Sequence, residues 1–485
     1  MNKFRWIAVV LLGVLLQGST TAQEVIYSGY DKFDLRTGDF SVIGKVGNRT
    51  YTYRGSSDGF FLDAYNDSME KIATVMLDFF PKKIYETRFI NYSDKILALY
   101  QAVESGKVVQ YAALLDETGR LTKGPIQLTS AKTGIFGANK DYFSSAISDN
   151  KQHILVYAIE ERNSELQMTG VWIDDALATT QRGGATFRAD NYVSNGEGII
   201  DNDGNFYLPA YAPVGTRNFA DQLWLLSLPR GGRRFVSKSL PLNDLYATST
   251  FMKLDNPNSR IYAGGFYSDK KNGNYEGVLY AWYDLTDSSW HNRKTLAFDE
   301  SLRTATGERN KRRAFNSFQV KQMIIKKDGG FVLIAEDFTV TTRNSAPGWG
   351  GYYSSYYGPF MNQSVREYNY EDIFALSYDG SGNKDWHAFV RKSQYSQEDG
   401  GVFSSFGMMN TGGTLGFLFN DFNSRGSRIQ LATINPEGNV NMQSLAAGGA
   451  SDPDWLPRSG KQVGLREMVV PCLRKRQICF AKIIF

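Results

Sequence analysis

IFAL (residues 373–376), DGSG (379–382) and AFV (388–390) follow one another in the stretch that decides the fold of this chain. After a polar passage the same order begins again, with TGG at 411–413 and LGFLF at 415–419. Short apolar runs that are rich in aromatic residues and bounded by Gly, Asn and Asp are typical of β-strands joined in hairpins. The stretch therefore predicts antiparallel strands rather than helices.

Two kinds of turn recur in step along the rest of the chain. The first kind precedes an apolar strand, at 47–48, 93–94, 149–150, 203–204, 256–258, 328–330 and 411–413. The second kind ends the next strand, at 66–67, 116–119, 174–175, 229–231, 284, 379–382 and 435–438. Each series advances by roughly 50–58 residues at most steps, a period that indicates a stacked or radial repeat. Each unit is thus predicted to be a four-stranded antiparallel sheet.

Sheets of this kind with no helices between them favour a β-propeller, in which radial packing leaves only short, protected sheet edges. Seven units are visible from Phe40 to about Ala447, and an eighth begins near Lys461 and ends one strand short at Phe485. The segment 25–30 (VIYSGY) is a candidate for the missing strand, and its pairing with the C-terminal unit would close the ring. We expect an all-β propeller of about eight blades, with seven as the alternative. Two packed sandwiches would not explain the constant period.

The first residues have the features of a secretory signal. Lys3 and Arg5 give a basic start, residues 6–16 form an apolar core, and TTA at 20–22 is a small-residue cleavage site. The core is shorter than the about 20 apolar residues of a membrane-spanning helix, and no later stretch is apolar enough for one. We expect a signal peptide at 1–22 and a single propeller domain at 23–485, secreted to the periplasm, the cell surface or the extracellular space. An uncleaved signal that tethers the chain is the alternative.

Composition and charge narrow the class of protein further. Lysine and arginine number 54 against 50 aspartate and glutamate, a formal net charge of +4, which is far from the basic excess of a nucleic-acid-binding domain. Aromatic residues make up 14% of the chain, and many glycines with few prolines suit strands and turns. We expect no nucleic-acid partner and a chain that is monomeric by itself.

Only two cysteines occur, Cys472 and Cys479, close together near the C-terminus. If Lys475-Arg476 forms a hairpin turn, the two lie opposite each other on adjacent strands. In an oxidising compartment that placement allows a disulfide across the pair. Two buried free thiols would pack equally well, and the sequence leaves both alternatives open.

Two units are longer than the others, with loop insertions predicted near 299–313 and 339–371. Insertions in repeat proteins map to loops on one face, which is often the binding face. The second insertion carries rings that suit stacking on sugars or anchoring a protein partner, namely Trp349, Tyr352, Tyr353, Tyr356 and Tyr357. A loop that folds these rings onto its own blade is the alternative. The first insertion has a basic cluster from Arg303 to Arg313, for which a solvated linker is favoured over contact with an acidic glycan or a membrane.

Metal-binding patterns are weak. The three histidines, His153, His291 and His387, fall in different predicted units, and no pair has the short spacing of a zinc site. The loop 201–205 (DNDGN) lacks the glycine position and the distal Glu of a calcium loop, so a hairpin turn explains its composition. We expect no metal site.

Catalytic patterns are equally sparse. Glu336-Asp337 and Asn420-Asp421 end corresponding strands in neighbouring units, so carboxylates there could gather on one face for glycoside chemistry. Solvated strand ends are the favoured explanation of the same residues. No catalytic residue is assigned from the sequence.

The pattern Asp379-x-x-Gly382-x-x-x-Trp386 resembles the strand-end motif of quinoprotein-type propeller blades. With the aromatic insertion and the segments 392–394 (KSQ) and 419–421 (FND), it is similar to quinoprotein-like and TolB-like secreted propellers of Gram-negative bacteria. The resemblance covers most of the chain after the signal. It implies the fold and export but brings no activity with it. A quinone would require clean Trp motifs in nearly every unit, so no cofactor is expected.

The sequence favours binding over catalysis. We expect an exported, non-catalytic binding or scaffold propeller at the bacterial cell envelope or surface, which recognises a protein or a glycan through its face loops. A carbohydrate-active enzyme, either a glycoside hydrolase or a lyase with carboxylates on the propeller face, is the first alternative. An accessory subunit of an outer-membrane or secretion assembly is the second.

Overall fold

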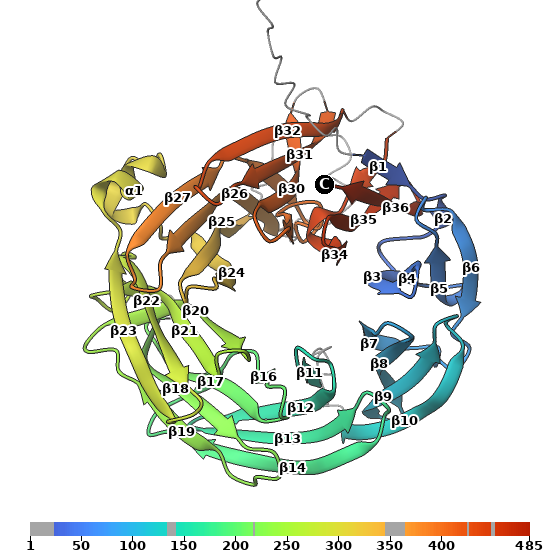
Figure 1. Ribbon diagram of the computed structural model, residues 1–485, viewed down its shortest axis with the longest axis horizontal. Helices are drawn as coiled ribbons and strands as arrows, with labels where there is room; N and C mark the ends of the chain where they lie inside the picture. Colours follow the sequence, from blue (N-terminus) through green and yellow to red (C-terminus); the bar gives the residue numbers. More distant parts are fainter. Residues whose placement is uncertain (1–23, 133–141, 217–218, 345–363, 424–425, 448–451) are drawn as a thin grey trace, which may run out of the picture.

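The protein is all-β and its sheets stand around a ring (Figure 1). Strands account for 63% of the computed structural model and helices for 3%, as the sequence predicts. Seven hydrogen-bonded sheets form the ring, and the nine-stranded one contains two blades that are joined by a single pair, Ala220 with Ala247. The chain is therefore a β-propeller of eight blades. The structure describes residues 24–132, 142–216, 219–344, 364–423, 426–447 and 452–485.

The blades, numbered in chain order, are built from four main antiparallel strands each. Blades 1 to 3 consist of β3 (Asp39–Val46), β4 (Arg49–Ser56), β5 (Gly59–Tyr65) and β6 (Lys71–Met76); β7 (Ile84–Asn91), β8 (Lys95–Glu104), β9 (Lys107–Asp116) and β10 (Leu121–Lys132); and β11 (Ser144–Ile147), β12 (His153–Arg162), β13 (Glu165–Asp174) and β14 (Thr179–Arg188). In blade 4 the inner position is shared by two short strands, and its members are β15 (Ser194–Asn195), β16 (Ile199–Ile200), β17 (Phe206–Val214), β18 (Phe219–Leu228) and β19 (Val236–Leu240).

The second half of the ring follows the same plan, with two small additions. Blades 5 to 7 consist of β20 (Tyr246–Asp255), β21 (Arg260–Ser268), β22 (Gly277–Asp284) and β23 (Ser289–Ala297); β24 (Phe318–Ile325), β25 (Phe331–Asn344), β26 (Ser364–Tyr378) and β27 (Lys384–Val390), with β28 (Gln394–Gln397) added to β26; and β29 (Gly407–Asn410), β30 (Leu415–Asn423), β31 (Gly426–Ile434) and β32 (Val440–Ala447). Blade 8 consists of β34 (Lys461–Gly464), β35 (Glu467–Arg474), β36 (Gln477–Ile484) and β1 (Glu24–Tyr27), with β2 (Asp31–Lys32), β33 (Asp454–Trp455) and the 3-10 turn η2 (Pro457–Ser459) beside them.

Blade 8 is completed by the N-terminal strand, as predicted. β1 runs antiparallel to β36 and places Val25 opposite Ile483. Beyond β1, Ser28 N donates a hydrogen bond to Phe480 O at 2.9 Å, and Phe480 N donates to Ser28 Oγ at 2.9 Å. The pairing joins the two ends of the chain in one sheet, so the ring has no open break between blade 8 and blade 1 (Figure 1).

The second predicted series of turns has one physical basis. The Asp or Asn at its first position accepts a hydrogen bond at Oδ1 from the backbone N–H four residues on, over 3.0 Å in Asp116–Arg120, 2.7 Å in Asp379–Asn383 and 2.8 Å in Asn435–Asn439. The residue three places on has a positive φ, +82° at Gly119, +81° at Gly382 and +83° at Gly438. A short polar side chain and a glycine are what such a turn requires, which is why the sequence repeats them.

Both series of turns lie on one face of the ring. Neighbouring strands alternate in direction, so the turns after the first and third strands of each blade share a face, which we name the turn face. The connections between second and third strands, and those between blades, emerge on the opposite face, which we name the loop face. The predicted insertions near 299–313 and 339–371 both belong to loop-face connections.

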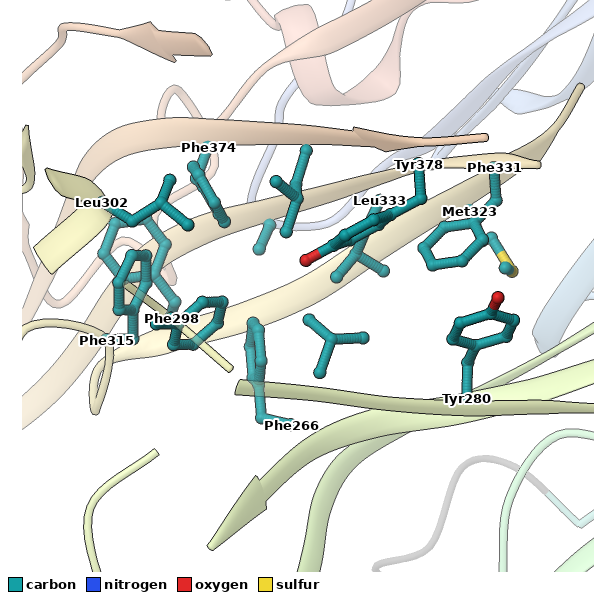
Figure 2. Close-up of a cluster of buried hydrophobic side chains, with 14 of the residues drawn as sticks. Phe266, Tyr280, Phe298, Leu302, Phe315, Met323, Phe331, Leu333, Phe374 and Tyr378 are labelled. Atoms are coloured by element: carbon teal, nitrogen blue, oxygen red, sulfur yellow. The ribbon is translucent and has the colours of Figure 1, made fainter. Parts of the chain in front are cut away.

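The core lies between neighbouring blades rather than in one central mass. Figure 2 shows the interface of blades 5 and 6, where Phe266 and Tyr280 pack against Phe331, Phe374 and other side chains of the next sheet. Each fully buried side chain of this size contributes about 1.5–3 kcal/mol relative to leaving it in water. The blades are held by such apolar faces, so the ring is stabilised at every junction.

The first insertion is solvated in part, as the sequence favoured, since Arg309, Lys311, Arg312 and Arg313 are exposed, but it is folded and anchored to the blades. It contains a short helix, α1 (Glu300–Ala305), and a 3-10 turn, η1 (Lys311–Arg313). Leu302 and Phe315 from this segment are buried in the junction of blades 5 and 6 (Figure 2). Arg303 Nη2 donates to Glu276 Oε2 at 2.8 Å, so one of the basic residues is held by the blade.

In the part of the chain that the structure describes, no helix has the length and hydropathy to cross a membrane.

Aromatic side chains reach from one blade onto a turn of the next. A Cβ on Gly438 of blade 7 would lie 2.7 Å from the Trp386 ring of blade 6, so this turn requires glycine. Tyr51 Oη donates to Glu117 O at 2.6 Å, and Trp172 Nε1 donates to Gly204 O at 3.2 Å. These contacts fix the angle between successive sheets at their turn-face ends.

Cys472 and Cys479 lie directly opposite each other in the register of β35 and β36. The turn between these strands is at Lys475-Arg476, as predicted, and Lys475 has φ +55°. Both sulfurs are buried and unbonded, and burial raises the pKa of the Cys472 thiol. The disulfide between them stays a prediction.

Candidate functional site

The five aromatic residues predicted to bind, Trp349, Tyr352, Tyr353, Tyr356 and Tyr357, lie outside the described residues. The strands that flank them are described. β25 and β26 stay paired as far as Asn344 opposite Ser364, and β28 adds to β26 with Tyr370 opposite Gln394. The second insertion is therefore connected to the loop face, the face on which the sites described below are found.

A pocket on the loop face lies between blades 4, 5 and 6. It has a volume of about 640 Å³, within the range of small-molecule sites. Its walls come from the link before β15, from the loop-face ends of β15, β17, β18, β20 and β24, and from the loop between β21 and β22. The residues that give it character are Tyr192, Tyr211, Tyr275, Ser249 and Gln319. We name it the large pocket.

Three tyrosines form the aromatic part of the large pocket. Tyr192 is 52% exposed and donates from Oη to Glu161 Oε2 at 3.2 Å, and the charge of Glu161 raises the pKa of this phenol. Tyr211 Oη donates to Asn195 O at 3.3 Å. The Tyr275 ring stacks on Phe266 with centroids 5.1 Å apart. The rings are held in place by these contacts, so they offer flat surfaces at little further loss of conformational entropy.

A smaller pocket of about 370 Å³ adjoins the large one. It lies between blades 2, 3 and 4, and Gly196 lines both pockets. Its polar residues include Glu86, Arg88, Tyr157 and Glu197. We name it the small pocket. Because a glycine stands at the shared wall, no side chain separates the two pockets at that point.

The polar groups of the small pocket are fixed by hydrogen bonds. Arg88 Nη1 donates to Ser145 O at 2.5 Å and to Ser145 Oγ at 2.8 Å. Gln101 Nε2 donates to Glu86 Oε2 at 2.5 Å. Gly198 N donates to Tyr157 Oη at 3.0 Å, and burial raises the pKa of Tyr157. The pocket thus offers a guanidinium, carboxylates and a neutral phenol, which can donate to and accept from hydroxyl groups.

A buried ionic network lies on the loop-face side of blade 6. The carboxylate of Glu336 is 0% exposed and its Oε1 lies 2.8 Å from Lys392 Nζ, whose side chain is 1% exposed. Ser405 Oγ donates to Glu336 Oε2 at 2.8 Å. Lys392 Nζ also donates to Gln394 Oε1 at 3.0 Å. Burial lowers the pKa of Lys392 in spite of the carboxylate beside it.

This network continues into blade 7 through Gln394. Gln394 Nε2 donates to Asn420 O at 2.7 Å, and Asn420 Nδ2 donates to Trp455 O at 2.9 Å. Glu336 and Asn420 occupy corresponding positions, each the sixth residue of its strand, but both lie inside the strands rather than at their ends. The expectation of solvated strand ends was wrong for them, because both side chains are buried. Asp337 is half-buried beside them, and burial raises the pKa of its carboxyl group. Both carboxylate oxygens of Glu336 have partners within the protein. We therefore infer that this network stabilises the loop face and does not bind a ligand.

The other residues singled out from the sequence lie apart from these pockets. His153, His291 and His387 belong to blades 3, 5 and 6. His291 Nε2 is 2.7 Å from Asp287 Oδ2, and burial lowers the pKa of His387. Within the described residues no group of three or more His, Cys, Asp or Glu side chains could hold a metal ion. The loop 201–205 is a hairpin turn before β17, in which Asn205 N donates to Asp201 Oδ1 at 2.8 Å.

Sequence reasoning missed the two pockets. Their walls combine residues from five blades, and no single unit contains a recognisable motif for them. One usable signal exists. Tyr192, Tyr211 and Tyr275 all lie in loop-face connections or near the loop-face end of a strand, so three tyrosines in such places could have indicated a shared aromatic surface.

Comparisons with known proteins found no matching family model and no matching curated protein. Among solved structures, prolyl oligopeptidase B from Galerina marginata bound to a 35mer substrate aligns with a TM-score of 0.42 and 10% identity over 90% of this chain. An ulvan lyase bound to a sulfated disaccharide unit aligns with a TM-score of 0.40 and 9% identity, over 81% of this chain and 90% of that one. The polysaccharide lyase Uly1 aligns with a TM-score of 0.38 and 9% identity, over 82% and 89%.

This chain spans 55% of the length of the prolyl oligopeptidase chain, so it matches about half of that protein. All three TM-scores lie below 0.5 and the identities near one residue in ten. Similarity at this level does not indicate what the chain binds or does. What the chain shares with enzymes of these two kinds is a propeller-like arrangement of four-stranded sheets.

Proposed function

We propose that this protein is an exported propeller that binds a glycan chain along its loop face without altering it chemically. The observation that carries the proposal is the pair of adjoining pockets of about 640 and 370 Å³ that share Gly196. Two neighbouring pockets that share a lining residue suit a ligand made of repeated units. Export rests on the signal predicted at residues 1–22.

The chemistry of the lining supports a sugar ligand. Sugar rings have apolar faces that stack on flat aromatic side chains, and Tyr192, Tyr211 and Tyr275 offer such faces in the large pocket. Sugar hydroxyls both donate and accept hydrogen bonds, and the small pocket supplies both kinds of partner, among them Arg88 and Glu197. Most of these groups are fixed by protein hydrogen bonds, so binding orders few side chains.

A protein partner fits the same surface less well. Protein interfaces of standard size have an apolar core that buries about 800 Å² on each partner. The two pockets are concave and their walls are largely polar, with serines, threonines, Asn195 and the carboxylates of Glu86 and Glu197. A chain of sugar units matches that mixture better than a folded surface does.

The test is retention of the purified protein on a glycan array, followed by titration calorimetry with the best-retained oligosaccharide. Tyr192→Ala removes an exposed ring from the large pocket and should weaken binding by about tenfold or more, equal to about 1.4 kcal/mol. Tyr192→Phe keeps the ring and should bind nearly as the wild type does. Tyr30→Ala is the control, because Tyr30 is also exposed but lies in blade 8 across the ring.

The outcomes distinguish glycan binding from the enzyme and the accessory subunit. Equal retention of the wild type and Tyr192→Ala, or retention of no glycan by the wild type, would overturn the proposal. Shortening of the bound oligosaccharide during incubation would show that the protein is a carbohydrate-active enzyme and not a binding protein. Copurification with an envelope protein that is unaffected by Tyr192→Ala would favour the accessory subunit instead.

A further inference from the structure

A small recess adjoins the small pocket between blades 2 and 3. It has a volume of about 10 Å³ and shares four lining residues with the small pocket, namely Glu86, Arg88, Phe143 and Ser145. Its remaining walls come from β8 and β9, the middle strands of blade 2, and consist of Leu99, Tyr100, Gln101 and Gln110. The recess therefore lies beside the small pocket, on the side of the interior of blade 2.

Gln101 is the polar residue that distinguishes this recess from the apolar interior around it. Residues 96–102 of β8 are buried, and apart from Gln101 their side chains are apolar or aromatic. Gln101 itself is 2% exposed. A buried amide costs free energy unless its donors and its acceptor find partners. The sequence therefore places a polar group here at a cost that hydrogen bonds have to offset.

The nitrogen of the Gln101 amide is satisfied and its oxygen is not. Nε2 donates to Glu86 Oε2 at 2.5 Å and to Phe143 O at 2.8 Å. Oε1 is buried and has no hydrogen-bond partner among the described residues. Exchanging the two atoms would place Oε1 against a carboxylate and a carbonyl oxygen, which only accept hydrogen bonds. The hydrogen bonds of Nε2 thus fix which end of the amide is the unpartnered oxygen.

Gln394 is a buried glutamine in which both ends of the amide are used. It is 1% exposed, and its Oε1 accepts hydrogen bonds from Ser405 N at 2.8 Å and from Lys392 Nζ at 3.0 Å. Its Nε2 donates to Asn420 O at 2.7 Å. Gln101 lacks the acceptor half of this pattern. A buried acceptor without a donor carries the full cost of its lost hydration, so Gln101 Oε1 requires a donor from outside the protein.

The size and the charges of the recess limit what that donor can be. A volume of about 10 Å³ is at the lower limit for one water molecule, so a single heavy atom fits beside Gln101. Arg88 donates from Nη1 to Ser145, and its Nε and Nη2 carry further N–H groups. A hydroxyl group can donate to Gln101 Oε1 and accept from Arg88. A carboxylate cannot donate, and an ammonium group would meet the like charge of Arg88.

We propose that the recess is a subsite for one hydroxyl group of the glycan, the hydroxymethyl group of a hexose unit that lies in the small pocket. A ring hydroxyl is attached directly to the sugar ring, whereas a hydroxymethyl group projects by one further carbon and can enter a recess that excludes the ring. The inference rests on the proposed function and identifies its ligand as a polymer of hexoses with free hydroxymethyl groups. In the protein without glycan, one water molecule should occupy the same place.

Crystal structures of the purified protein test the recess without any glycan. A water oxygen should lie about 2.5–3.0 Å from Gln101 Oε1. After a soak in ethylene glycol, a small hydroxymethyl compound, a hydroxyl oxygen of the glycol should replace that water. Gln101→Met, which keeps the side-chain length and removes the amide, should hold neither. A recess without any bound oxygen overturns the inference, and so does a water that ethylene glycol does not displace, because that water is then a fixed part of the structure.

Affinity for matched oligosaccharides tests the class of ligand. Cellohexaose and xylohexaose share their linkage and differ in the hydroxymethyl group. Mannohexaose and a mannuronate oligomer of the same linkage differ in the oxidation of that group to a carboxylate. In calorimetry the wild type should bind the member with the hydroxymethyl group at least about tenfold more tightly, and Gln101→Met should lose most of that difference.

Three results of these binding measurements contradict the inference. They are equal affinities of the wild type for the two members of a pair, an unchanged preference in Gln101→Met, and best retention on the array of a pentose, deoxyhexose or uronate polymer. Gln394→Met is the matched control, because it removes another buried glutamine amide in blade 6. It should lower the Tm and leave the preference for the hydroxymethyl group unchanged.

The inference and the proposed function can fail separately. If Tyr192→Ala weakens glycan binding but the wild type has no preference for the hydroxymethyl group, only the inference about the recess is wrong. If the wild type retains no glycan, the proposed function is wrong. The water and ethylene glycol structures then still decide whether the recess accepts a hydroxyl group beside Gln101.

Discussion

Glu336 and Lys392 form an ion pair of 2.8 Å from which solvent is excluded, since the two side chains are 0% and 1% exposed. The pair joins the middle of blade 6 to the link that leads into blade 7. Gln394 and Ser405 bond to the same groups, so the pair is the centre of a network and not an isolated contact. Glu336 belongs to β25, so the network lies within the long hairpin of β25 and β26.

Removing either charge of this pair should be costly. Lys392→Met leaves a buried carboxylate without its main counter-charge and should lower the free energy of unfolding by about 3–5 kcal/mol. The double variant Glu336→Gln, Lys392→Met should lose clearly less than the sum of the single changes, because no lone charge is left behind. Urea unfolding of the four proteins measures the coupling. Lys32→Met in an exposed pair should change stability by less than about 1 kcal/mol, and additive effects at blade 6 would contradict the role of the pair.

The contact of Trp386 with Gly438 can be measured against a matched glycine. Gly438 and Gly412 have nearly the same backbone angle, φ +83° and +85°, but no atom lies within 4 Å of a Cβ built on Gly412. Gly412→Ala should therefore lower the free energy of unfolding only by the cost of holding alanine in the left-handed conformation, about 1–2 kcal/mol. Gly438→Ala should cost about 1–3 kcal/mol more, because the new methyl group meets the Trp386 ring. If the two variants lose the same free energy of unfolding in chemical denaturation, the Trp386 ring moves away from the new methyl group without a cost in free energy.

Alkaline pH should unfold the protein through its buried tyrosines. Burial raises the pKa of Tyr280, which is 2% exposed, to about 12, whereas a tyrosine in an unfolded chain titrates near about 10. The folded state therefore holds this proton more tightly, so the stability it contributes is complete below about pH 10 and is lost as the pH rises toward 12.

Absorbance at the tyrosinate band, followed together with circular dichroism during a pH titration, checks this prediction. Ionisation of the buried group of tyrosines should coincide with loss of β-structure. Tyr280→Phe should move the unfolding transition to higher pH, and the surface variant Tyr395→Phe should not. Ionisation of all tyrosines well before any loss of structure would show that the rings are more accessible than their packing indicates.

The two cysteines should be unreactive in the native state. Cys472 and Cys479 are buried opposite each other, which limits the access of reagents to both sulfurs. Burial raises the pKa of the Cys472 thiol, whereas the hydrogen bond with Cys472 lowers the pKa of Cys479, so the expected inertness rests on burial. Reduced protein should resist alkylation until it is unfolded. Residues directly opposite in an antiparallel pair have Cα atoms about 4.5–5.5 Å apart, which is within disulfide range. Protein exported to an oxidising compartment should thus be lighter by two hydrogens in intact-mass analysis, and an unchanged mass would assign both residues as free thiols.

Much of the fold was predictable because its decisive features are local. The turn at Asp379–Gly382 depends on one side-chain oxygen and one positive φ within five residues, and both residue types can be recognised without coordinates. Ring closure was predictable for a different reason. A unit that is one strand short leaves an open edge, and the segment around Val25 was the free strand available to fill it.

The candidate site was far less predictable, since its parts meet only in three dimensions. Arg88 and Glu197 line one pocket although about two blades of sequence separate them, and neither stands in a recurring motif. Lys392 was visible from the sequence as part of a conspicuous segment, but its burial was not, because lysines are rarely found without solvent. The helix α1 was missed because the basic residues around it obscured the apolar anchors Leu302 and Phe315.

The hydrogen bond between Phe480 N and Ser28 Oγ joins positions 452 residues apart. During biosynthesis the first strand must wait, unpaired, until nearly the whole polypeptide has emerged, and until then blade 8 is an incomplete sheet with an exposed edge. Such long-range pairing is slow to form and vulnerable to aggregation. Ring closure is therefore the folding step with which association between molecules competes most directly, because the edge of β36 that pairs with β1 is the edge that another molecule could occupy.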